Sequence, residues 1–146
     1  MSLPTEKDFD PWGGNLDAQW AWRNFGGLAL EAAKERFQQN PECYQEDFMF
    51  MGSRAFAFYF PVIESYLLDA PSEDDSFDRC AWILAHVIIN QLQWDTKSYV
   101  LPLIPRIRSL IQFVRQNIAS FDNDEAEQAR ILLAWTELDE VVRQFG

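Results

Sequence analysis

The chain has 146 residues, of which 48% are hydrophobic and 15% aromatic, a composition that excludes intrinsic disorder and fits one domain. Twelve Lys and Arg against 23 Asp and Glu give a net charge of −11, which opposes binding to nucleic acid or to an anionic membrane surface. Six Gly and seven Pro are too few for the turn-dense all-β folds. We therefore expect a single all-α domain over residues 1–146, with a loosely structured N-terminal segment at 1–15.

Hydrophobic periodicity predicts helices along almost the whole chain. Glycines and prolines divide the first half into four of them: Asp17–Phe25, Leu28–Gln39, Glu42–Met51 and Arg54–Leu68. We expect Ser53 to be the N-cap of the fourth helix, and Pro61 to kink it. In the second half the pattern predicts Phe77–Gln93, Leu103–Ile118 and Asn123–Phe145, the last opened by a capping-box pair of Asp122 and Glu125.

The segment Phe77–Gln93 is apolar nearly all round, which predicts a helix that its neighbours surround. Its polar residues Arg79, His86, Asn90 and Gln93 fall on one narrow strip, because successive helical residues turn by about 100°. This strip either marks the line where the helix meets water or lines a shallow polar groove. The predicted fold is thus a compact bundle of six or seven helices around residues 77–93.

Cysteines and targeting signals point to the cytoplasm. Cys43 and Cys80 lie among apolar residues without a CxxC partner, so we expect both to be buried free thiols. The acidic N-terminus is unlike a secretory signal, and the longest apolar runs fall short of the ~20 residues that a membrane span needs. We therefore predict a cytoplasmic protein that binds neither membrane nor nucleic acid.

The sequence motifs of catalytic and cofactor sites are missing. His86 is the only histidine, and the residues three and four positions from it are poor metal ligands. No nucleophile elbow and no phosphate-binding glycine loop occurs. We predict no catalytic residue, no metal and no cofactor. Carboxylates beside aromatic segments, at Glu46, Asp47 and Glu64, leave a general acid of raised pKa as the one enzymatic feature still open.

Charge is segregated along the second half of the chain. Residues 96–120 carry four cations and no anion, whereas residues 122–140 carry seven anions and one cation. Either the two helices screen each other, or the last helix presents an acidic face to a partner. In the second case the candidate interaction surface consists of acids from the 69–78 connector and the last helix, namely Asp74, Asp75, Asp78, Glu137, Asp139 and Glu140.

Three stretches of the first half, Trp20–Gly27, Tyr44–Gly52 and Ala55–Pro61, together resemble a pattern in a family of small uncharacterised bacterial proteins. The resemblance implies a bacterial source and a helical fold. It brings no activity and no catalytic residues with it.

The leading functional hypothesis is a non-enzymatic interaction module, such as an immunity-type protein that neutralises a basic partner. The alternative is a small-molecule-binding protein or hydrolytic enzyme, with a pocket between residues 56–66 and the central helix. Its polar groups would be Tyr59, Glu64, His86 and Asn90. A third hypothesis is a homodimer in which two copies share the surplus aromatic surface of Trp12, Trp20 and Trp22.

Overall fold

The computed structural model describes residues 2–69 and 81–145, and within them all regular structure is helical. The expected all-α bundle is confirmed, with eight α-helices in these residues against six or seven expected. The helices are α1 (Glu6–Phe9), α2 (Leu16–Phe25), α3 (Leu30–Gln39), α4 (Pro41–Phe50), α5 (Ser53–Asp69), α6 (Ala81–Gln93), α7 (Ile104–Gln116) and α8 (Glu125–Arg143). Three 3₁₀ turns, η2 (Lys97–Tyr99), η3 (Leu101–Leu103) and η4 (Ile118–Ser120), flank α7.

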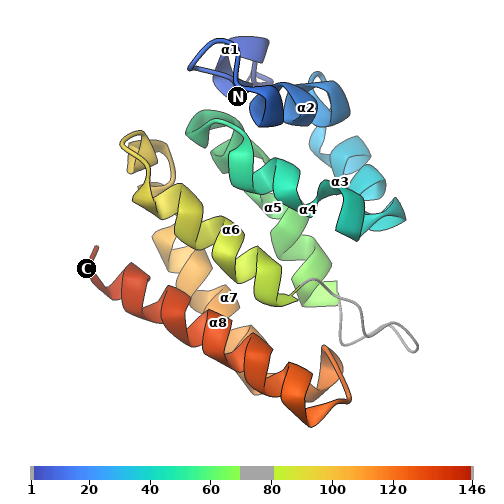
Figure 1. The fold of residues 1–146 in the computed structure, drawn as a ribbon, viewed down its shortest axis with the longest axis vertical. Coiled ribbons are helices and arrows are strands. Elements are labelled where there is room, and N and C mark those ends of the chain that lie inside the picture. Colours follow the sequence, from blue (N-terminus) through green and yellow to red (C-terminus); the bar gives the residue numbers. More distant parts are fainter. Residues whose placement is uncertain (1, 70–80, 146) are drawn as a thin grey trace.

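Helix α6 lies in the middle of the bundle, between α4 on one side and α8 on the other (Figure 1). Seven of its thirteen residues are buried, as a helix of this apolarity requires. The predicted residues 77–80, with Arg79 and Cys80, lie outside the described part of the chain. From α8, the fully buried Trp135 donates its indole N–H to the carbonyl oxygen of Ala81 at 2.8 Å, which joins α8 to the first turn of α6.

The last turn of α4 is capped by side chains of α6. A helix leaves its final carbonyl groups without partners inside the helix. The amide of Gln91, a residue with no exposed surface, donates to the carbonyl oxygens of Phe48 at 3.0 Å and Met51 at 2.8 Å. Asn90 donates to the carbonyl oxygen of Met49 at 3.0 Å. These bonds fix the end of α4 against the centre of the molecule.

The N-terminal segment, expected to be loose, is instead tied to the core in residues 2–15. Thr5 and Asp8 form a capping box at α1, and Phe9 is fully buried. The backbone N–H of Gly52 donates to the carbonyl oxygen of Phe9 at 2.8 Å. A Cβ atom at Gly52 would lie 2.1 Å from the carbonyl oxygen of Asp8, so only glycine permits this close approach.

Two predicted N-caps are wrong by one or two residues. Ser53 is the first residue of α5 rather than its cap, and its hydroxyl lies 2.6 Å from that of Thr96. At α8 the cap is Asp124, whose carboxylate accepts from the N–H of Glu127, in place of the pair formed by Asp122 and Glu125. At α8 the neighbouring residues Asp122, Asn123 and Asp124 all have capping side chains, so sequence alone leaves the choice between them open.

Tyr59 joins α5 to the α2–α3 turn. Its buried hydroxyl donates to the carbonyl oxygens of Phe25 at 3.1 Å and Leu28 at 2.7 Å, and burial raises its pKa to about 12. The turn runs through Gly27, whose φ of +79° favours glycine.

We predict that Tyr59→Phe lowers the free energy of unfolding by about 1–2 kcal/mol, because the Leu28 carbonyl group loses the hydroxyl donor and the Phe25 carbonyl group keeps only the backbone N–H of Leu28. Urea unfolding of this variant beside Tyr99→Phe measures the effect, since Tyr99 is 51% exposed. An equal stability of the two variants would contradict the assignment of a stabilising role to the Tyr59 hydroxyl.

Candidate functional site

The four side chains of the predicted pocket do not come together. Tyr59 turns towards the α2–α3 turn, and Glu64 forms an ion pair with Arg106 of α7. Tyr59 and Glu64 are five residues apart on one helix, about 140° around its axis, so they face different neighbours. Asn90 is engaged with α4, and His86 lies edge-on to Trp82 at 5.9 Å. The pocket predicted between residues 56–66 and α6 is therefore wrong in its composition.

The predicted acidic surface is only partly available. Asp74, Asp75 and Asp78 lie outside the described residues. Asp139 forms ion pairs with Arg143 at 2.9 Å and with Arg115 of α7 at 3.5 Å, which is the mutual screening of α7 and α8. Glu137 and Glu140 are exposed on α8.

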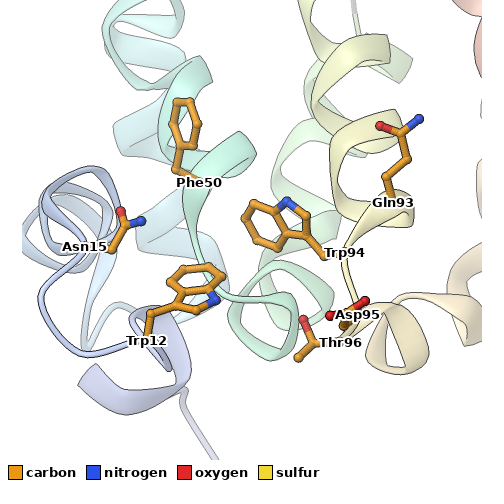
Figure 2. A pocket seen from close by; sticks show the side chains of 7 residues that line it. All are labelled: Trp12, Asn15, Phe50, Gln93, Trp94, Asp95 and Thr96. Atoms are coloured by element: carbon orange, nitrogen blue, oxygen red, sulfur yellow. The ribbon is translucent and has the colours of Figure 1, made fainter.

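A hollow of about 440 Å³ lies where the α1–α2 loop meets the ends of α4 and α6 (Figure 2). We call it the indole hollow; it is lined by Trp12, Asn15, Phe50, Gln93, Trp94, Asp95 and Thr96. The rings of Trp12 and Trp94 are 5.1 Å apart and almost perpendicular, at 89°. Figure 2 shows Asn15, Phe50 and both indoles around one shared space, whereas the Gln93 side chain extends away from the pair.

The turn that carries Trp12 is built on Asp10. The carboxylate of Asp10 accepts from the backbone N–H groups of Gly13, Gly14 and Asn15 at 2.8–3.2 Å. Burial alone would raise its pKa, but these bonds and one from Gln19 outweigh it, so the pKa lies below the usual value. Gly13 and Gly14 adopt φ of +70° and +104°, which suits glycine. The turn thus holds Trp12 opposite Trp94.

A second hollow, of about 340 Å³, lies between α2 and α4 and shares Phe50 with the first. We call it the acidic hollow; it is lined by Asp17, Trp20, Asn24, Cys43, Tyr44, Glu46, Asp47 and Phe50. Neither lining contains a lysine or an arginine. Cys43 is exposed here, so the expectation that it is buried is wrong. It occupies the outer side of the first turn of α4, away from the apolar face.

Asp47 is the most perturbed acid of the acidic hollow. It is 8% exposed and accepts from the side-chain amide of Asn24 at 2.8 Å. Burial raises its pKa to about 6, with further increases from the nearby charges of Glu46 and Asp17, although the Asn24 bond acts the other way. The sequence had indicated this residue as a carboxylate of raised pKa. Burial is thus the main cause of the raised pKa, and the neighbouring carboxylates add to it.

The two hollows are lined by carboxylates and large aromatic rings. Among the described residues no group of three or more His, Cys, Asp and Glu is placed to hold a metal ion. In the same residues no helix is both long enough and apolar enough to cross a membrane. Carboxylates and electron-rich aromatic faces, in contrast, both attract cations.

Comparisons of the chain with protein-family models, with curated proteins and with solved structures give no match. The resemblance of the first half to small bacterial proteins therefore stays a prediction, and the functional argument depends on the geometry of the hollows.

Sequence reasoning missed both hollows and the role of Gln91. The signal for Gln91 was present, because it lies three and seven residues after the apolar Ile88 and Leu84 and so faces the core with them. For the indole hollow no such signal exists, since Trp12, Phe50 and Trp94 are far apart in the chain.

We predict that Asp47→Asn raises the free energy of unfolding at pH 7 by about 1–3 kcal/mol. The folded protein holds a proton on Asp47 up to about pH 6, whereas an unfolded carboxyl loses it near 3.8. Ionisation of Asp47 therefore lowers the free energy of unfolding of the wild type as the pH rises between these two values. The difference in unfolding free energy between Asp47→Asn and the wild type should vanish near pH 4.

Urea unfolding at pH 4, 5, 6 and 7.5 measures this difference, with the exposed Glu137→Gln as the control. If the free energies of unfolding of Asp47→Asn and of the wild type change with pH in parallel, the prediction is wrong and burial does not shift the pKa of Asp47.

Proposed function

We propose that this protein is a non-enzymatic interaction module that binds a basic protein through the adjoining indole and acidic hollows. The observation that carries the proposal is the composition of this continuous surface. Its lining residues include four carboxylates and five large aromatic rings but no lysine or arginine, and the cation of Arg23 lies over the ring of Trp20. The acids and rings are Asp17, Glu46, Asp47, Asp95, Trp12, Trp20, Tyr44, Phe50 and Trp94.

The net charge of −11 supports a basic partner, since a field of that sign speeds the approach of cations. Affinity after contact would come from the exposed rings, because aromatic anchors dominate many interfaces. Trp12 is 48% and Trp20 57% exposed, and Leu16 between them is 74% exposed. An immunity-type role in neutralising a cationic toxin is the finer form of this proposal.

Self-association through the same surface is less favourable, because a two-fold dimer would bring the carboxylates of two copies together. Trp22, also considered for a dimer, is engaged within the chain, where it packs on Phe9 at 5.4 Å. Hydrolytic chemistry is disfavoured too, since His86 lies against Trp82 and away from the carboxylates of the hollows.

The experiment compares two double variants with the same net charge of −9. One is Asp17→Asn with Glu46→Gln in the acidic hollow, and the other is Glu137→Gln with Glu140→Gln on α8. The probe is a deca-lysine peptide, titrated at low and high salt. We expect binding to weaken about tenfold more in the acidic-hollow variant, and to weaken in every variant as salt rises.

An equal loss in both variants would show attraction by net charge alone, and a larger loss in the α8 variant would move the interface to Glu137 and Glu140. Binding that does not depend on salt would contradict electrostatic capture. Each of these three results contradicts the proposal.

A further inference from the structure

We propose that the indole hollow is a cage for an alkylammonium group, and that its occupant is the head of a lysine side chain of the basic partner. This inference deepens the proposed function, on which it rests. It names the chemical group that the hollow recognises and separates its contribution from that of the acidic hollow.

The two indoles of the hollow have the geometry of an aromatic cage. At 89° and 5.1 Å they present the face of one ring and the edge of the other, and Phe50 borders the same hollow. Figure 2 shows the two indoles pointing toward each other from the α1–α2 loop and from the end of α6, with the Phe50 ring extending away from them along α4. A cation is attracted to the negative face of an aromatic ring, most strongly to tryptophan, and several rings around one space add their attractions.

The described part of the chain places no cation of its own over the two indoles. Elsewhere in the described chain arginines cover exposed aromatic faces: Arg130 lies 3.5 Å from the centre of the Trp82 ring and Arg23 lies 5.0 Å from that of Trp20. Neither Trp12 nor Trp94 has such a partner among the described residues. The pair therefore keeps its attraction for a cation from outside.

Negatively charged side chains lie beside the cage. Asp95 borders it, and the adjoining acidic hollow begins at the shared Phe50. A lysine head is compact and sits on a narrow apolar stem, which suits a ring-lined hollow beside carboxylates. Attachment of three methyl groups keeps the charge and enlarges the apolar contact, so trimethyl-lysine should bind more tightly than lysine.

The cage is also held in place before any ligand arrives. The Asp10 turn fixes Trp12, and Gln91 and Asn90 fix the end of α4 next to Phe50. A site formed in advance loses less conformational freedom when it binds.

The experiment uses the full chain and capped pentapeptides Gly-Gly-X-Gly-Gly, in which X is lysine, trimethyl-lysine or norleucine. Binding is followed through the indole N–H signals in ¹H–¹⁵N NMR spectra. Norleucine keeps the apolar stem without the charge. We expect trimethyl-lysine to bind most tightly, lysine next, and norleucine at least about fivefold more weakly than lysine.

Variants locate the site. Trp12→Leu keeps an apolar side chain but removes the ring, and should weaken binding of the trimethyl-lysine peptide about fivefold or more. Tyr99→Leu, at an exposed aromatic ring that lines neither hollow, is the matched control and should leave it unchanged. Because Trp12 is half exposed, neither change should unfold the protein, which the dispersion of the spectra checks.

Two results would overturn the inference: norleucine binding as tightly as lysine, or equal losses in Trp12→Leu and Tyr99→Leu. Free choline binding more tightly than every peptide would overturn the assignment of a lysine and indicate a small-molecule site. If these peptides fail while deca-lysine still depends on Asp17 and Glu46, the cage is wrong and the proposed function stands.

Discussion

The fold depends on the hydrogen bonds with which side chains of α6 cap the C-terminal end of α4. The buried amide of Gln91 and the half-buried amide of Asn90 supply donors to the final carbonyl groups of α4, which have no partner within that helix. A carbonyl buried without a donor costs about 1–3 kcal/mol, so a central helix of apolar residues alone could not cover this end. The placement of Phe50, and with it the wall shared by the two hollows, follows from these bonds.

Acidic side chains are paired with arginines on one side of α6 and lie in a hollow without a lining cation on the other. On the α7–α8 side, cations and anions meet within the molecule, as Asp139 does with Arg115 and Arg143 and as Glu64 does with Arg106. On the α2–α4 side, burial raises the pKa of Asp47, with smaller increases from the charges of Glu46 and Asp17, and the hollow around it is lined without a lysine or an arginine. The interaction surface that we propose therefore lies on the α2–α4 side, where the acids of the hollow have no lysine or arginine among its lining residues.

The sequence predicted the helices well and the site poorly, for one physical reason. Periodicity and breaker residues act within a few positions, so the bounds of α2 and α4 and the buried face of α7 could be predicted. The hollows join residues from three separate segments, which only the packed fold brings together. Asp47 was indicated by its aromatic neighbours in the sequence, whereas the acids predicted on α8 include Asp139, which is paired internally.

The most direct test of this account is the stability of Gln91→Leu, compared with Gln112→Leu at an exposed position of α7, together with amide hydrogen exchange at Met51 and Gly52. The account predicts that Gln91→Leu alone loses about 2 kcal/mol of unfolding free energy and that these two amides exchange faster than in the wild type. Equal stability of the two variants, with unchanged exchange at the end of α4, would contradict it.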